Sequence, residues 1–285
     1  MLAMEQVIRR EEATFVGADG LRLACCAWLP DGVPPRGAIA SVHGLGDHTE
    51  LYDVVFDYFV RRGWAVHGFD LRGNGRSPGQ RGHVDRWSLY REDLQRFVEH
   101  VRLSHPEKLV LLGTSLGGAI VLEYALHHPE HLAGVAAAAP ALGRPNVPGW
   151  MLMLGRAMSR IWPTFSLETG LDLSGISRDA AALERITGDR LFHRLASARL
   201  STELTAAGER VRAAARDFRV PVLLLHGSAD RLVPPDATRM LAALADPRMV
   251  EYREYPGAYH ALFADVDRQI VLSDLERWIA ERAVE

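Results

Sequence analysis

The stretch that most constrains the fold is residues 109–118, LVLLGTSLGG, in which an apolar run of strand length leads into a serine flanked by glycines. Gly113-Thr-Ser115-Leu-Gly117 is a G-x-S-x-G pattern, and its small residues let the backbone turn sharply and expose the serine hydroxyl. An apolar segment with helical spacing follows, up to Pro129. The sequence therefore predicts a strand, a tight turn at Ser115 and a helix.

Other strand-like runs alternate with helical patterns on both sides of this turn. These runs cover residues 37–42, 64–69, 132–139, 220–225 and 249–255. Alternation of this kind is typical of a mostly parallel sheet covered by helices on both faces.

Two local signals add detail in the first part of the chain. Residues 14–17 and 21–29 are predicted to form a hairpin around Asp19-Gly20, a frequent turn pair. Asp85 is predicted to be the N-cap of the helix that follows it.

The alternation breaks between residues 143 and 219, where the sequence shows no strand-like run. Helices are expected there over 150–161, 179–186 and 205–218. The block carries twelve arginines and eight acidic residues, whereas the rest of the chain has more acidic than basic residues. We therefore predict an α/β fold whose core comprises residues 1–142 and 220–285, with an inserted helical cap at 143–219.

The residues that a serine nucleophile needs follow two of the later strands. A serine hydroxyl attacks a carbonyl group only with a base, usually histidine, that a carboxylate orients. Asp230 follows the strand at 220–225, and His260 follows the strand at 249–255. With Ser115, both would lie at the carboxyl ends of strands in one sheet, where open α/β sheets place their sites. The order serine, aspartate, histidine is that of α/β-hydrolases.

Other acidic residues and histidines have simpler interpretations. Asp265 and Asp267 are rivals to Asp230, but they follow His260 at a helix start, where an acidic residue stabilises the helix. His226 is expected to be a structural turn partner, His67 a core residue, and the histidines within 127–131 the end of a helix. No H-E-x-x-H pattern is present, and we expect no metal site.

An oxyanion formed during ester cleavage needs at least two hydrogen-bond donors. The backbone N–H of Leu116, at the start of the helix after the serine, is one candidate. The second should come from the loop after the strand at 37–42, and Leu45, between Gly44 and Gly46, is placed to supply it. The alternative is that residues 43–46 form only a tight turn.

Five motifs, taken in order, resemble those of the monoacylglycerol lipase branch of the α/β-hydrolases. They are His43-Gly-Leu-Gly46, Asp70-Leu-Arg-Gly-Asn-Gly-Arg-Ser77 with Pro78-Gly-Gln-Arg-Gly82, Gly113-Thr-Ser-Leu-Gly-Gly118, Gly227-Ser-Ala-Asp-Arg-Leu232 and Gly257-Ala-Tyr-His260. The resemblance spans about residues 35–265 and is weakest in the cap. It implies a cofactor-independent serine hydrolase that cleaves carboxylic esters of medium or long acyl chains through an acyl-enzyme, above all a monoacylglycerol to glycerol and a fatty acid. The implied roles are Ser115 as nucleophile, His260 as base and then acid, Asp230 as orienting group, and Leu45 and Leu116 as oxyanion donors.

The resemblance also implies a helical cap whose apolar face lines an acyl tunnel and touches membranes. Candidate substrate contacts in this chain are Trp150, Met153, Met158 and Trp162. Methionine and tryptophan suit an adaptable acyl site or an interfacial surface, although a methionine-rich amphipathic helix also packs in ordinary cores.

Two positions depart from the pattern of this branch. Thr114 stands before the serine, where histidine is common, and Leu51 stands where a basic residue is common. Both would flank the polar end of the pocket, so cleavage of an ester follows more directly than recognition of glycerol. Lysophospholipase or generic carboxylesterase activity is the nearest alternative. A ligand receptor on the same fold, without turnover, is the alternative of another class.

Residue types argue against other chemistries of the same fold. Dehalogenases and epoxide hydrolases need an aspartate at the position of Ser115, and an aminopeptidase would need an acidic cluster in the cap, which is basic here. A net charge of −3 argues against general binding of nucleic acids.

Composition and termini bear on location and partners. The first residues lack the apolar segment of a signal peptide, and no run approaches 18 uninterrupted apolar residues. Cys25 and Cys26 are adjacent in an apolar run, which favours packing roles in a reducing compartment. We therefore expect a cytoplasmic protein that binds a small lipid or ester and touches membrane surfaces transiently through its cap. The sequence carries no sign of its oligomeric state.

Overall fold

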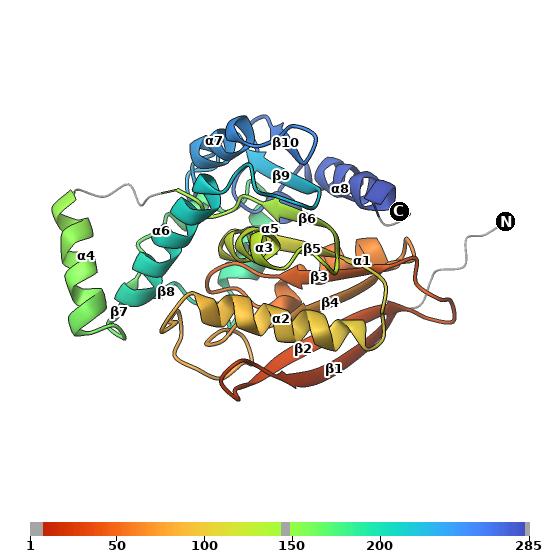
Figure 1. The fold of residues 1–285 in the computed structure, drawn as a ribbon, viewed down its shortest axis with the longest axis horizontal. Coiled ribbons are helices and arrows are strands. Elements are labelled where there is room, and N and C mark those ends of the chain that lie inside the picture. Colours follow the sequence, from red (N-terminus) through yellow and green to blue (C-terminus); the bar gives the residue numbers. More distant parts are fainter. Residues whose placement is uncertain (1–7, 144–148, 283–285) are drawn as a thin grey trace.

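The computed structural model describes residues 8–143 and 149–282, and every structural statement below refers to these residues. Figure 1 shows a central twisted sheet between two layers of helices, with one helix standing at the edge of the molecule. Eight strands of the described chain form the sheet, in the spatial order β1-β2-β4-β3-β5-β6-β9-β10. They are β1 (Ile8–Val16), β2 (Arg22–Pro30), β3 (Ala38–Val42), β4 (Ala65–Phe69), β5 (Leu109–Thr114), β6 (Leu132–Ala138), β9 (Val222–Gly227) and β10 (Val250–Tyr255).

All pairs from β4 to β10 are parallel, whereas β1 pairs antiparallel to β2, and β2 antiparallel to β4. Every residue of β3, β4 and β5 is buried, as expected for parallel strands that helices cover on both faces. The helices on one face are α2 (Ser88–Arg102), α3 (Leu116–His127), α6 (Ala198–Ala213) and α7 (Asp236–Leu244). Those on the other face are α1 (Asp53–Val60) and α8 (Arg268–Arg282). The predicted mostly parallel sheet with helices on both faces is confirmed.

The first strand is longer than its sequence indicates. The hairpin forms as predicted, but β1 begins at Ile8 rather than at residue 14, and its register with β2 runs from Ile8 opposite Pro30 to Val16 opposite Arg22. Most of its side chains are exposed, because β1 is an edge strand. A charged edge strand lacks the apolar alternation that identifies strands, so the pattern missed its first half.

The prediction that Asp85 caps the next helix was wrong. Helix α2 begins at Ser88, with Trp87 in the N-cap position. The backbone N–H of Trp87 donates to the carboxylate of Glu203, on α6, at 2.9 Å. Asp85 instead lies 3.1 Å from Nε2 of His83. A distant helix therefore supplies the acceptor that a local capping residue would have supplied.

The chain between β6 and β9 leaves the sheet, and we call its residues 149–213 the cap segment. It contains α4 (Gly149–Ile161), β7 (Ser166–Glu168), a 3-10 turn η2 (Leu173–Gly175), α5 (Ala180–Thr187), β8 (Leu195–Ser197) and α6. The expectation of no strand here was wrong, because β7 and β8 pair antiparallel. Each has only three residues, too few for a recognisable run. The helix expected over 205–218 begins earlier, where the Ser197 hydroxyl accepts the Leu200 N–H at 3.0 Å.

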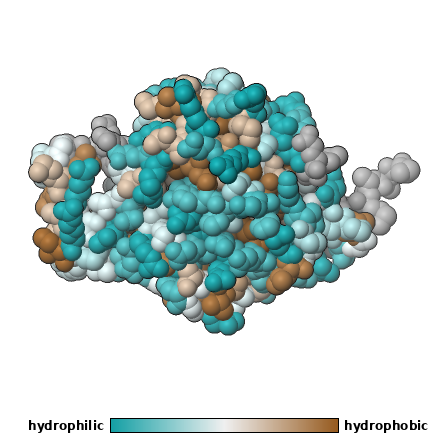
Figure 2. Space-filling model, in the orientation of Figure 1, coloured by the Kyte–Doolittle hydropathy of each residue, from teal (hydrophilic) through white to brown (hydrophobic). Residues whose placement is uncertain are grey.

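Helix α4 packs on α6 and stands at the edge of the molecule (Figure 1). Large apolar side chains are exposed along and just beyond it, and Figure 2 shows hydrophobic residues gathered there. They are Trp150, Met151, Met153, Leu154, Ile161 and Trp162. No helix in the described part of the chain has the length and apolarity needed to cross a bilayer.

Candidate active site

Ser115 lies at the corner between β5 and α3, in a strained backbone conformation. Its φ of 54° and ψ of −114° fall in a region that residues other than glycine rarely adopt. The turn is held because the Ser115 N–H donates to the Ala138 carbonyl oxygen at 2.9 Å. Gly117 must be small, since a Cβ there would overlap the carbonyl oxygen of Val42. The strand, turn and helix predicted around Ser115 are thus present.

Asp230 and His260 come together in the loops that follow β9 and β10. Nδ1 of His260 lies 2.7 Å from Oδ2 of Asp230, so the ring donates this proton to the carboxylate and leaves Nε2 for the reacting group. The other oxygen, Oδ1, accepts the backbone N–H groups of Leu232 and Val233 at 2.9 Å each. These contacts hold the carboxylate in one orientation.

The environment of Asp230 keeps its carboxyl group ionised. Burial opposes ionisation, but the facing His260 and a hydrogen bond from His226 outweigh it and hold the pKa of Asp230 below its usual range. Nε2 of His226 lies 3.2 Å from Oδ2 of Asp230. His226 also contacts Thr238 and the Val233 carbonyl oxygen, so it is a structural partner of this loop.

The rival acids Asp265 and Asp267 lie in a different set of contacts. Asp265 is buried and accepts the backbone N–H of Tyr259 at 2.9 Å and Nε of Arg178 at 2.9 Å. Asp267 pairs with the same guanidinium group at 2.7 Å. Arg178, from the cap segment, therefore contacts both carboxylates. Asp265 fixes the loop next to His260 through the backbone of Tyr259.

The loop after β3 lies beside the serine. Within it, Nδ1 of His43 donates to the Gly44 carbonyl oxygen at 2.7 Å, and Nε2 of His43 accepts the Leu71 N–H at 2.9 Å. Burial lowers the pKa of His43, which keeps the ring neutral in this tautomer. Leu45 and Leu116 line the same cavity as the serine, so the two predicted oxyanion donors and the predicted nucleophile border one space.

This space is a cavity of about 840 Å³ between the carboxyl edge of the sheet and the cap segment. Ser115 and His260 line it together with mostly apolar side chains. Concave sites of this size and character are typical of pockets that bind small apolar molecules. The cavity therefore brings an apolar binding space next to the predicted nucleophile and base.

The four predicted substrate contacts divide into two pairs. Trp150 and Met158 lie in the lining of the cavity. Met153 and Trp162 lie outside the lining, with 71% and 56% of their surface exposed. Met153 lies within α4, whereas Trp162 follows the last residue of that helix, Ile161.

A polar group that the sequence motifs did not single out lies in the same cavity. The Tyr52 hydroxyl donates to Oδ2 of Asp47 at 2.7 Å, and Thr114 lines the wall with them. Burial and the Asp47 charge raise the pKa of Tyr52 well above its usual value, so the phenol stays protonated. Leu51 also lines the cavity, and its carbonyl oxygen accepts Nη1 of Arg185, on α5, at 3.0 Å. The cap segment thus supplies a cation beside Leu51.

Within residues 8–143 and 149–282, no group of three or more histidine, cysteine or acidic side chains is arranged to hold a metal ion.

The chain is similar to a family of known enzymes. The family described as serine aminopeptidase, S33, matches residues 33–267. A monoacylglycerol lipase from Mycolicibacterium smegmatis is 30% identical over 273 residues, which are 95% of this chain and 97% of that protein. Monoglyceride lipase from Rattus norvegicus is 31% identical, over 94% of this chain and 90% of its own.

Solved structures match as well. The crystal structure of Paleococcus ferrophilus monoacylglycerol lipase matches with a TM-score of 0.82 at 32% identity, covering 97% of this chain and 99% of the other. A soluble variant of monoglyceride lipase from Saccharomyces cerevisiae, in complex with a substrate analogue, matches with a TM-score of 0.83 at 23% identity over 99% of this chain and 97% of the other. These matches extend over the sheet and the cap segment alike.

Proposed function

Because this chain belongs to the serine aminopeptidase S33 family, with the fold of α/β-hydrolases, we propose that it cleaves monoacylglycerols into glycerol and a fatty acid. It is a carboxylic ester hydrolase, and its resemblance to monoacylglycerol lipases is confirmed by the likeness over nearly its whole length. The observation that carries the proposal is the position of Ser115 and His260 on one mostly apolar cavity. An acyl chain bound there would bring its ester group to the serine.

The proposed reaction uses the groups at the carboxyl ends of β5, β9 and β10. The Ser115 hydroxyl attacks the ester carbonyl while His260 takes its proton, and Asp230 stabilises the imidazolium ion. The backbone N–H groups of Leu45 and Leu116 bind the oxyanion. His260 then protonates the departing glycerol oxygen, and a water molecule, activated by the same histidine, hydrolyses the acyl-enzyme.

The family name refers to peptidases, but the cavity favours an ester. An aminopeptidase would bind the ammonium group of its substrate with carboxylates that have no other partner. Here Asp47 accepts the Tyr52 hydroxyl, and Glu168 pairs with Arg194. The remaining lining is mostly apolar, which suits an acyl chain better than a charged peptide end.

The two pairs of residues at α4 suggest two tasks for the cap. In this proposal residues 143–219 form the cap, and Trp150 and Met158, which line the cavity, contact the acyl chain. Met153 and Trp162 are exposed with the other apolar residues at α4 and contact the membrane surface that supplies the substrate. The expectation of a cytoplasmic location stays a prediction.

The test is hydrolysis of a chain-length series of monoacylglycerols beside matched lysophospholipids and p-nitrophenyl esters, with Ser115→Ala in parallel. We expect a preference for monoacylglycerols and a loss of kcat in the variant of about 10⁴-fold or more, because the nucleophile is removed. Turnover of activated short esters alone would reduce the function to that of a generic carboxylesterase, and a preference for lysophospholipids would make it a lysophospholipase. Tight ligand binding without turnover would favour the receptor alternative.

A further inference from the structure

The cap segment contacts the loop that carries one proposed oxyanion donor. We call residues 43–48 the oxyanion loop and residues 189–194 the cap loop. The backbone N–H of His193, in the cap loop, donates to the Gly46 carbonyl oxygen at 3.0 Å. A Cβ on Gly46 would overlap the carbonyl oxygen of His193, so the two backbones are in direct contact. The cap and the proposed catalytic machinery therefore share an interface.

The direction of the Leu45 N–H depends on the geometry of the oxyanion loop. This N–H belongs to the same peptide unit as the Gly44 carbonyl group, and in a trans peptide the two point in opposite directions. His43 holds that carbonyl oxygen at 2.7 Å, and the Asp47 N–H closes a turn to it at 3.4 Å. Gly46 occupies the third position of the turn with a φ of +74°, as a type II turn requires. A shift of Gly46 would therefore rotate the donor.

The side chain of His193 makes hydrogen bonds through both of its ring nitrogens. Nε2 lies 2.9 Å from Oδ1 of Asn74, and Nδ1 accepts the Leu195 N–H at 3.2 Å. Asn74 is fully buried, and its own amide donates to the Arg72 carbonyl oxygen at 3.0 Å, so Oδ1 is the atom that faces the ring. These partners fix the neutral tautomer with its proton on Nε2. The ring thus links the cap loop to the buried loop after β4.

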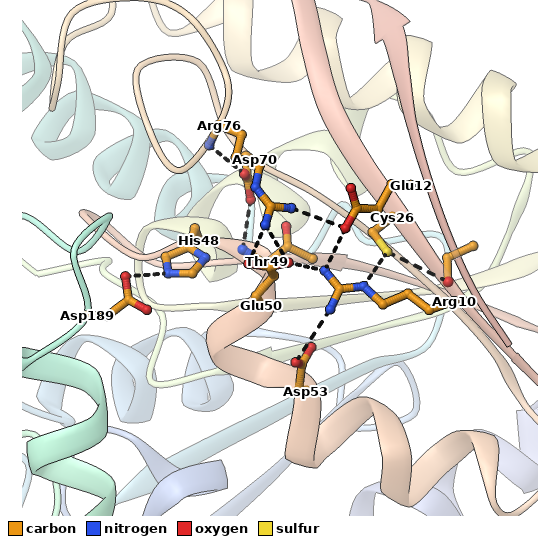
Figure 3. Close-up of polar contacts among 11 residues, drawn as sticks. Arg10, Glu12, Cys26, His48, Thr49, Glu50, Asp53, Asp70, Arg76 and Asp189 are labelled. Carbon is orange, nitrogen blue, oxygen red and sulfur yellow. Dashed lines mark hydrogen bonds and ion pairs between the residues drawn. The ribbon is translucent and has the colours of Figure 1, made fainter. Parts of the chain in front are cut away.

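A second contact joins the same two segments. Nε2 of the buried His48 lies 3.0 Å from Oδ1 of Asp189, at the start of the cap loop. Figure 3 shows His48 facing Asp189, while Asp70 accepts the backbone N–H of the neighbouring Thr49 at 2.8 Å. The oxyanion loop therefore contacts the cap at Gly46 and at His48.

We propose that His193 is a positioning residue, which holds the oxyanion loop in its productive conformation through the hydrogen bond to Asn74. The inference rests on the proposed function, because it assigns the loop to oxyanion binding. It makes the cap a part of transition-state stabilisation as well as a cover for the acyl chain. Interactions made only in the transition state change kcat rather than KM, which separates this role from a contact with the substrate.

The test compares three substitutions of His193, and Asn74→Ala combined with the first of them, on a dissolved p-nitrophenyl ester. His193→Ala removes both side-chain bonds, whereas His193→Gln keeps an amide nitrogen that reaches Asn74, and His193→Asn keeps an oxygen that accepts the Leu195 N–H. We expect His193→Ala to lower kcat about tenfold, with KM within twofold of wild type. This loss of kcat is smaller than the loss caused by removing an oxyanion donor altogether. Gln should restore most of the activity and Asn should not. Asn74→Ala should add little further loss of kcat to His193→Ala, because both substitutions break the same hydrogen bond between His193 and Asn74.

A second measurement keeps the test independent of folding and of substrate identity. The affinity for an alkyl trifluoromethyl ketone, which forms a tetrahedral adduct with the serine, should fall by the same factor as kcat/KM in each variant that keeps the wild-type melting temperature. The proposal is overturned if His193→Ala keeps kcat within twofold, if KM alone rises, or if Asn restores activity and Gln does not. A wild type that cleaves nitrophenyl esters but no monoacylglycerol would refute the proposed substrate and leave this test intact.

Discussion

At the scale of single residues, the two carboxylates of Asp230 and Asp265, near His260, differ in the groups that they contact. Asp230 faces the imidazole ring at 2.7 Å, whereas Asp265 accepts from Arg178 and from the backbone of Tyr259. The sequence places both acids within reach of the same histidine. Only the directions of the side chains separate the group that we propose orients His260 from the one that fixes its loop.

This difference predicts unequal effects of two matched substitutions on kcat. Asp230→Asn presents an amide to Nδ1 of His260 and favours the wrong tautomer, so kcat should fall about 10⁴-fold. Asp265→Asn removes a buried charge from Arg178, so the melting temperature should fall while kcat changes less than about tenfold. Steady-state kinetics and thermal unfolding of both variants check this. Equal losses of kcat would contradict the assignment of Asp230 as the orienting acid.

Residue types in short motifs were enough to nominate Ser115, Asp230 and His260, and their catalytic roles stay proposals until the variants are measured. The same approach missed His193 and its contacts. His193 belongs to a stretch without any motif, and its partners Gly46 and Asn74 are more than a hundred residues away in the chain. Contacts of this range carry no signal in a single sequence, because nothing local requires them.

At the scale of elements, α4 stands out because it leaves large apolar side chains exposed to solvent. Its neighbour is α6, and large apolar side chains along it and just beyond it remain exposed. Patterns of apolar residues located the helix, but they could not tell which of its residues line the cavity and which do not, since an apolar residue suits a cavity lining and an outer surface equally. The short strands β7 and β8 were missed for a related reason, because three residues are too few to show a period.

The exposed residues Met153, in α4, and Trp162, just beyond it, predict a membrane effect that is separate from catalysis. The double substitution of Met153→Glu with Trp162→Glu should weaken binding to phosphatidylcholine vesicles at least about tenfold, because each side chain contributes about 1.5–3 kcal/mol when it leaves water. Hydrolysis of a dissolved p-nitrophenyl ester should stay within twofold of wild type. Vesicle co-sedimentation and ester assays measure the two effects.

A matched control comes from another part of the fold. Leu103, at the end of α2, is 83% exposed and lies outside the cap segment. Leu103→Glu removes a comparable apolar side chain and should leave vesicle binding unchanged. If it weakens binding as much as the double substitution does, the membrane contact is not specific to α4.

At the scale of the whole molecule, buried histidines connect stability to pH. Burial lowers the pKa of His67, in β4, to about 3, and burial with the nearby Arg81 lowers the pKa of His193 to about 4. Both rings are therefore neutral in the folded protein at a pH where an unfolded chain, with a histidine pKa of about 6.5, binds protons. The unfolded state then gains protons that the folded state excludes, so stability falls as the pH drops.

We expect the free energy of unfolding to decrease between about pH 6.5 and pH 4, with each of these histidines contributing a slope of up to about 1.4 kcal/mol per pH unit. His67→Leu removes one of them and should reduce the slope by that amount. Urea unfolding at a series of pH values from neutral to about pH 4 measures both proteins. An unchanged slope in the variant would show that His67 takes up a proton in the folded state.

The place where the chain leaves the sheet also bears on how proteins of this kind diversify. Strands β6 and β9 are neighbours and parallel, so everything between them is, in topological terms, a single crossover connection. Lengthening, shortening or replacing parts of that connection leaves the strand order unchanged, provided that the contacts of His193 with Gly46 and of Arg178 with Asp265 are kept. Selection can therefore act on the compounds that such an enzyme accepts through one continuous stretch of its gene, while the groups proposed to be catalytic are inherited unchanged.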